Sequence, residues 1–277
     1  MYQGKLIASG MAFRHVPFRE AVRLLKENGV DGLEATLNGF HFRHLEDMTE
    51  YEMRKAAETA ERNGVRVYAL NSSAGCYPPN PRGGMLNGIQ ALRLASFLGA
   101  ETVTLSAGCI VPGTDTIEGL KTIAAYFNEM SLIAWNEYGI RLSAEAPHRG
   151  TCSEKLEQIK TYWAYMPERL GCTLDVAHVT YAGTTVEKVL DVIGPRLRHV
   201  HLRDAVPGNS LLPYGKGCVD FAEVFRLLGS RGYRGMCSLE YPGPEDPAEA
   251  VQVFMNGIKY LISKQKEANF QGETDHV

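Results

Sequence analysis

The feature that most constrains this chain is an alternation of short apolar runs with longer amphipathic segments, repeated along nearly its whole length. The runs that predict strands are residues 5–9, 32–36, 66–71, 102–107, 141–145, 171–175, 199–202 and 236–240. The segments that predict helices are residues 17–28, 49–63, 84–98, 116–138, 153–165, 185–193, 221–229 and 247–263. Because a helix between two strands returns the chain to the same end of the sheet, this order predicts parallel strand pairing.

Eight such units in 277 residues give a repeat of roughly 35 residues, which suits a barrel of about 250 residues. A doubly wound open sheet shares the alternation, but no GxGxxG motif follows the first predicted strand, which weakens that alternative. We therefore predict a single (β/α)8 TIM barrel over residues 1–263, with a polar C-terminal tail over residues 264–277.

Charge and cysteine usage narrow the class of protein further. The net charge is −3, which argues against a nucleic-acid partner. No apolar run approaches the ~20 residues needed to cross a bilayer, so we expect no membrane partner. The six cysteines form no CxxC pair and the first residues do not look like a signal peptide. These two observations predict reduced thiols and a cytoplasmic location.

A barrel places its active site where the strands end, and four successive predicted strands end in metal-capable side chains. These residues are Glu145, Asp175, His201 and Glu240. Any one of them has a simpler explanation, since a strand-end carboxylate often caps a helix and a histidine is often buried in a core. Three carboxylates gathered in one mouth would instead repel one another unless a cation held them. The series therefore predicts one divalent ion, with Mn²⁺ preferred and Mg²⁺, Co²⁺ or Zn²⁺ also compatible.

Several further residues are candidates for substrate binding. His148 follows Glu145 by three positions and could act as a base or as an acid for a leaving group. Arg203 and Lys216 could bind a carboxylate, a phosphate or a sugar hydroxyl, and Glu34 could bond a substrate hydroxyl or only the barrel rim. An exposed loop histidine or a solvated charge explains most of these residues equally well.

Four segments carry a family resemblance. They are GCTLDVAH (171–178), RHVHLRD (198–204), PYGKGCVDF (213–221) and GYRGMCSLEYPG (232–243). Together they resemble the xylose isomerase-like barrel superfamily, and within it the sugar phosphate isomerase/epimerase branch. The resemblance implies that the same four residues are the metal ligands. It also implies that Glu145 and Glu240 move protons on opposite faces of a bound sugar, and that His178 contacts substrate or supports the metal shell. Dimers and tetramers are common among similar proteins, so a homo-oligomer is an open expectation.

The sequence also departs from some members of that superfamily. Endonuclease IV, a DNA-repair member with three metals, has extra histidines after its third and fourth strands, where this chain has Asn71 and Ser106. The ketose 3-epimerases carry another glutamate after the first ligand and an arginine past the H-x-H element. Here those regions read Ala-Pro-His-Arg (146–149) and Ala-Val-Pro-Gly (205–208), which leaves the substrate open.

We predict a metal-dependent isomerase or epimerase that acts on a small sugar or keto-sugar by proton transfer through a metal-stabilised enediolate. The same intermediate would serve a dehydratase or lyase acting on a keto-polyol or keto-glycoside. A non-catalytic sugar-binding barrel is a third interpretation. The pairing of Glu145 with Glu240 argues against it, because a binding protein needs no opposed proton-transfer groups.

Overall fold

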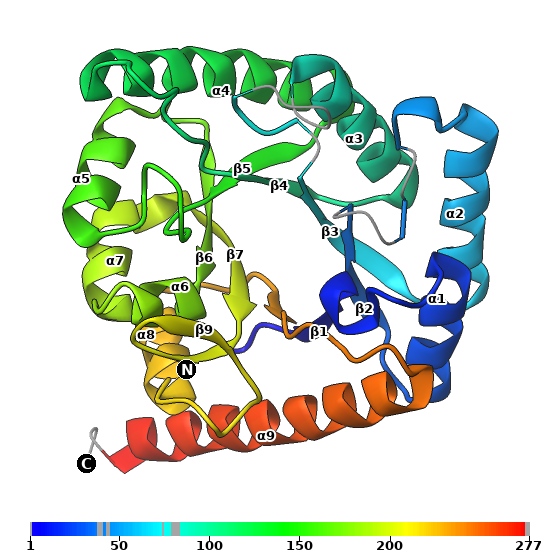
Figure 1. Ribbon diagram of the computed structural model, residues 1–277. Helices are drawn as coiled ribbons and strands as arrows, with labels where there is room; N and C mark the ends of the chain where they lie inside the picture. The colour runs from blue at the N-terminus through cyan, green and yellow to red at the C-terminus, as the bar shows by residue number, and fades with distance from the viewer. Residues whose placement is uncertain (1, 38–40, 43–44, 74, 79–83, 275–277) are drawn as a thin grey trace.

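The computed structural model describes residues 2–37, 41–42, 45–73, 75–78 and 84–274. Eight parallel strands close into a barrel in the order β1-β10-β7-β6-β5-β4-β3-β2 (Figure 1). Their bounds are β1 Leu6–Ser9, β2 Gly32–Thr36, β3 Arg66–Ser72, β4 Thr102–Ser106, β5 Arg141–Glu145, β6 Gly171–Asp175, β7 Leu197–Leu202 and β10 Cys237–Leu239. The chain thus folds as a single (β/α)8 TIM barrel, which confirms the predicted fold class.

Helices surround the barrel on all sides (Figure 1). They are α1 Phe18–Glu27, α2 Glu50–Arg62, α3 Met85–Leu98, α4 Thr116–Tyr138, α5 Leu156–Tyr165, α7 Val186–Ile193, α8 Phe221–Ser230 and α9 Pro247–Thr274. Short additional elements are α6 Val176–Tyr181 and the 3-10 turns η1 Gly10–Phe13, η2 Leu45–Asp47 and η3 Gly194–Arg196. None of the described helices combines the length and the apolar character that a membrane crossing requires.

Local side-chain chemistry fixes where the helices begin and end. Thr49 caps α2 in a capping box with Glu52, in which each side chain accepts from the other residue's backbone N–H. The Asp115 carboxylate accepts from two backbone N–H groups at the start of α4. Gly139 ends the same helix with a φ of 65°, a left-handed conformation that glycine adopts without steric cost. These signals lie in the sequence itself, which is why the predicted bounds of α4 agree with the structure.

The interior of the barrel is polar as well as packed. Thr104 and Thr173, on strands that are not neighbours, share a hydrogen bond of 2.8 Å between their hydroxyls, so both side chains point inward. Glu34 of β2 reaches His199 of β7 across the same interior. Buried polar groups are tolerated only where they are hydrogen-bonded. The barrel therefore holds an ordered polar layer directly beneath its mouth.

Two parts of the chain differ from the sequence-based expectations. The polar segment expected to be a tail from residue 264 instead continues α9 as far as Thr274, while residues 275–277 lie outside the described part. Its Lys, Gln, Glu and Ala residues are good helix formers, and Lys264 pairs with Glu267 one turn on. Ala268 is buried, so this extension also packs against the protein.

The second difference is an antiparallel hairpin after β7, formed by β8 Asp204–Val206 and β9 Asn209–Leu212. The Asp204 carboxylate accepts hydrogen bonds from the backbone of Ala205, Gly215, Gly217 and Val219. A Cβ on Gly217 would stand 2.1 Å from an Asp204 carboxylate oxygen, so the position requires glycine. This network ties the start of the hairpin to the G-K-G segment at residues 215–217.

Candidate metal centre

Four acidic or imidazole side chains meet at the C-terminal mouth of the barrel. Glu145, Asp175 and His201 lie in the last part of the neighbouring strands β5, β6 and β7, and Glu240 directly follows β10. Each offers a ligand atom, and these four atoms all lie within 4.8 Å of one another. All four side chains are buried. The structure therefore brings together the four residues that the strand ends predicted.

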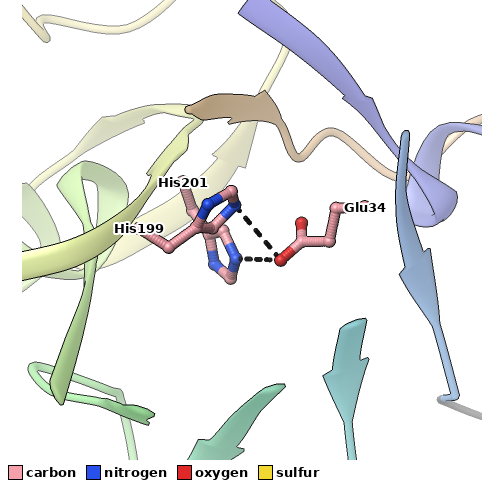
Figure 2. Close-up of side chains that lie close together, drawn as sticks. All are labelled: Glu34, His199 and His201. Atoms are coloured by element: carbon pink, nitrogen blue, oxygen red, sulfur yellow. Dashed lines mark hydrogen bonds and ion pairs between the residues drawn. The ribbon is translucent and has the colours of Figure 1, made fainter. Parts of the chain in front are cut away.

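His201 stands at the centre of this group. Its Nδ1 lies 3.0 Å from Glu145 Oε1 and 3.3 Å from Glu240 Oε2. Its Nε2 faces the other way, into the barrel, and lies 2.9 Å from Glu34 Oε1 (Figure 2). A neutral imidazole carries one N–H, so donation from Nε2 to Glu34 leaves Nδ1 with a lone pair directed at two carboxylate oxygens.

That arrangement of atoms fits a cation at Nδ1. Burial would lower the pKa of His201, but the facing Glu240 and Glu34 carboxylates outweigh it and raise the pKa well above its usual value. In addition, Glu240 Oε2 is a buried oxygen with no hydrogen-bond partner among the described residues. A group of three carboxylates and one imidazole nitrogen is a hard donor set that suits a divalent ion. The residues present could therefore hold one.

Glu34, which was expected to bond a substrate hydroxyl or only the barrel rim, lies inside the barrel and faces two histidines. Its carboxylate is fully buried and bonded on both oxygens, because Oε1 faces His199 and His201 while Oε2 accepts from the Ser238 hydroxyl at 2.7 Å. Figure 2 shows both imidazoles directed at this one carboxylate. Burial alone would raise the pKa of Glu34, but the two imidazoles hold it well below its usual value. Glu34 therefore orients His201.

Asp175 has two separate tasks, one for each oxygen. Oδ1 accepts from the backbone N–H groups of Ala177 and His178 and so caps α6. Oδ2 accepts from Arg203 Nη2. The short helix α6 was not predicted, and its cap fixes the position of the Asp175 carboxylate. One of the Asp175 carboxylate oxygens lies within 4.8 Å of the ligand atoms of Glu145, His201 and Glu240.

Arg203 lies among the acidic residues. It is buried, and besides Asp175 it contacts His178 Nε2 at 3.0 Å and approaches Glu240 Oε2 at 3.8 Å. Burial opposes its charge, but Asp175 and Glu240 outweigh that effect and raise its pKa further. Its positive charge therefore offsets part of the negative charge of the cluster.

Two histidines border the cluster on the side of β5 and β6. The rings of His148 and His178 lie 4.3 Å apart, centroid to centroid. His148 Nε2 is 3.7 Å from Glu145 Oε2, and one third of its side chain is exposed. His178 is buried, and this burial lowers its pKa. His148 is thus the imidazole that solvent and a ligand can reach.

Of two further polar residues, Asn71 contacts the cluster and Lys216 does not. Lys216 is exposed and forms no ion pair with any described residue, so it does not contact the carboxylates of the cluster. Asn71, at the end of β3, donates from Nδ2 to Glu240 Oε1 at 3.2 Å. Sequence reasoning considered Asn71 only as a missing histidine ligand. Its position at a strand end was the available signal for a role at the mouth.

Comparison with known proteins settles the family. The family model described as "Xylose isomerase-like TIM barrel" matches residues 22–262. The chain belongs to this family. An inosose dehydratase of Yersinia enterocolitica is 28% identical to this xylose isomerase-like barrel over 165 residues, which is 52% of this chain and 52% of that protein. The matched region thus spans about half the length of that relative.

Solved structures agree with the fold. A crystal structure of the IolI protein with a binding zinc atom has a TM-score of 0.74 and 17% identity, and covers 95% of this chain and 99% of that chain. A D-tagatose 3-epimerase-like protein has a TM-score of 0.71 and 22% identity, with 95% and 99% covered. At such identities the likeness of this xylose isomerase-like barrel to both proteins is one of fold.

Proposed function

We propose that this protein is a metal-dependent enzyme that moves a proton at the carbon next to the carbonyl of a small keto-sugar or keto-polyol. The observation that carries the proposal is that both Glu145 and Glu240 place a carboxylate oxygen close to His201 Nδ1, at 3.0 and 3.3 Å. Two carboxylates held around one buried site suit proton removal and proton return at a single substrate position. Relatives that carry the names inosose dehydratase and D-tagatose 3-epimerase-like protein support a carbohydrate substrate.

The four clustered residues would hold the ion, with Mn²⁺ as our first proposal and Mg²⁺, Co²⁺ or Zn²⁺ as alternatives. A divalent ion, when bound, supplies polarisation of the substrate carbonyl, which acidifies the neighbouring C–H. The zinc atom in the IolI structure supports a divalent ion in this fold. The barrel's own contribution is to hold the ligands rigid through Glu34, Asn71 and the α6 cap.

The two glutamates differ in their surroundings, and the difference suggests their tasks. Glu240 is held through Oε1 by Asn71, while Oε2 stays without a hydrogen bond. We assign to Glu240 the removal of the proton from the substrate carbon. Glu145 has His148 beside Oε2, and 9% of its own side chain is exposed, so a proton on this carboxylate can exchange with solvent. Proton return from Glu145 to the opposite face of the carbon would give epimerisation.

A dehydratase is the second candidate, and His148 is the observation that favours it. In dehydration, the base takes the proton next to the carbonyl, and the C–O bond of the β-hydroxyl breaks as the C=C bond forms. The departing hydroxyl then takes a proton and leaves as water. The imidazole of His148, one third exposed and beside Glu145, stands where it could supply that proton.

An exchange experiment tests the proposal. The metal-loaded protein is incubated with a panel of keto-sugars and inososes in D₂O and followed by NMR. Deuterium at the carbon next to the carbonyl, with the carbon skeleton and oxygen count intact, supports the epimerase or isomerase. Formation of an enone supports the dehydratase. The absence of both exchange and elimination across the panel, with sugar binding still measurable, would contradict the proposal and favour a binding protein.

A further inference from the structure

A cavity of about 210 Å³ lies near the opposite end of the barrel from the metal centre. Arg141 is the first residue of β5, whose last residue is Glu145, and Arg198 lies near the start of β7, well before His201. Arg169 precedes β6 and completes the basic lining. The cavity shares no residue with the acidic cluster, so a ligand bound there would be independent of the proposed function.

The positive charge of this cavity is not balanced by the protein. Arg141, Arg169 and Arg198 form no ion pair with any carboxylate in the part of the chain that the structure describes. The guanidinium of Arg198 donates instead to the carbonyl oxygens of Pro195 and Leu197. Burial and the nearby charge of Arg141 lower the pKa of Arg198, as expected where like charges gather.

The position of the Arg198 side chain depends on Gly171 in the neighbouring strand β6. A Cβ on Gly171 would stand 2.4 Å from Arg198 Cγ and 2.7 Å from Ser143 Oγ. Glycine at this position of β6 therefore lets the aliphatic part of Arg198 lie close against the barrel wall. The side chain is partly exposed, and its hydrogen bonds to the Pro195 and Leu197 carbonyls hold the guanidinium beside the cavity.

An unsatisfied hydroxyl lines the same cavity. Ser131, on α4, is only 4% exposed, and its Oγ has no hydrogen-bond partner among the described residues. Buried hydroxyls nearly always have a partner, and a serine inside a helix commonly bonds a carbonyl of the preceding turn. This one is left available to a ligand in the cavity.

We propose that this cavity binds a phosphate group, either as inorganic phosphate or as a phosphate monoester of a small molecule. Three guanidinium groups and a hydroxyl offer more donors than the two oxygens of a carboxylate can accept. A phosphate presents three or more acceptor oxygens and nearly two negative charges, and arginine matches its geometry with paired N–H donors. The volume is below the roughly 300–1,000 Å³ of pockets that enclose drug-sized ligands, which suits a compact anion.

Trp135 should distinguish a phosphate monoester from inorganic phosphate, because its indole can contact only an organic group. Its indole lines the cavity and is 54% exposed, an unusual position for so large an apolar surface. A monoester with its phosphate on the arginines would place its organic part against this ring. Monoesters with an aromatic group should therefore bind more tightly than inorganic phosphate.

Calorimetric titration of the metal-loaded protein with inorganic phosphate and with phenyl phosphate tests this inference. We expect one site for both ligands and tighter binding of phenyl phosphate. Arg141→Gln and Arg169→Gln should each weaken both ligands roughly tenfold, the usual effect of losing a charged hydrogen bond. Arg62→Gln is the matched control, because Arg62 is exposed on α2, outside the cavity, and the substitution removes the same charge. Trp135→Ala should weaken phenyl phosphate alone.

Two results would overturn the inference. One is the absence of phosphate binding at millimolar concentration. The other is binding that Arg141→Gln and Arg169→Gln leave unchanged, which would place the anion on the metal ion or on another surface. Ser131→Ala gives a further check, because it should weaken the binding of both ligands while the three arginines stay in place.

Discussion

Glu34 Oε1 lies 2.9 Å from His201 Nε2, so a fully buried carboxylate fixes the imidazole whose opposite nitrogen faces Glu145 and Glu240. This contact fixes the tautomer of His201 and raises the electron density at Nδ1. Replacing a carboxylate that supports a metal-binding histidine in this way typically lowers the affinity of the site for its metal.

Glu34→Gln tests this relationship. The amide can fill the same space, but it removes the negative charge that makes His201 a strong ligand. We expect the affinity for Mn²⁺ to fall about 10–100-fold, as measured by titration of the metal-free protein. Glu129→Gln, an exposed position on α4, is the control for the loss of charge. Unchanged affinity in Glu34→Gln would show that His201 needs no such support.

Asn71→Ala tests the orientation of Glu240. The change removes the hydrogen bond to Glu240 Oε1 but leaves all four candidate ligands in place. We expect kcat to fall roughly tenfold, the scale of one hydrogen bond to a charged group, with metal stoichiometry maintained. Glu240→Gln should cost more, about 10²–10⁴-fold, because it removes the base itself. A kcat in Asn71→Ala equal to that of the wild type would exclude this positioning role.

His148→Asn separates the two proposed reactions. If Glu240 removes the proton, deuterium exchange next to the substrate carbonyl should persist in this variant at close to the wild-type rate. Any dehydration should fall by about 10²–10⁴-fold, because the leaving hydroxyl would lose its acid. NMR in D₂O measures both rates in one sample. Loss of exchange in His148→Asn would instead make the imidazole part of the proton-removal step.

The pH dependence of stability provides a prediction outside the metal centre. Burial lowers the pKa of His41 from its ordinary 6.5 to about 4. Between these values the unfolded chain binds a proton that the folded chain does not, so the free energy of unfolding should fall as pH is lowered through this window. The contribution of one such group is at most about 1.4 kcal/mol per pH unit.

Urea unfolding at several pH values measures this slope. His41→Phe keeps an aromatic ring next to Phe18 and Phe42 but removes the titrating group and its contact with the Phe13 carbonyl. The variant should therefore show a shallower loss of stability between pH 6.5 and 4. Equal slopes in both proteins would mean that His41 has the same pKa in the folded and unfolded states.

The barrel could be predicted from the sequence because the residues that begin and end its strands and helices lie within those elements or next to them. Strand β5 begins and ends at the predicted residues, and α4 has both its Asp115 cap and its Gly139 stop within a few residues of its ends. The convergence of Glu145 with its three partners followed from the fold, since neighbouring parallel strands end at one rim. The identity of the bound ion does not follow from the same reasoning, because several divalent ions accept these donors.

Other features depend on contacts between distant parts of the chain. The role of Glu34 depends on His201, which lies 167 residues away in sequence. The β8–β9 hairpin is fastened by Asp204 through backbone donors that no side-chain pattern reveals. The extension of α9 beyond residue 263 was missed because a polar segment resembles a tail until its packing is known.

The most direct test of the proposed metal centre is the amount of divalent metal bound per chain. The wild type and the double variant Glu145→Gln, Glu240→Gln are dialysed against Mn²⁺ and then against buffer, and their metal content is measured by elemental analysis. Circular dichroism confirms that both are folded. We predict one ion per wild-type chain and essentially none in the folded double variant. A wild type that retains no ion, or a double variant that retains as much as the wild type, would contradict the proposed centre.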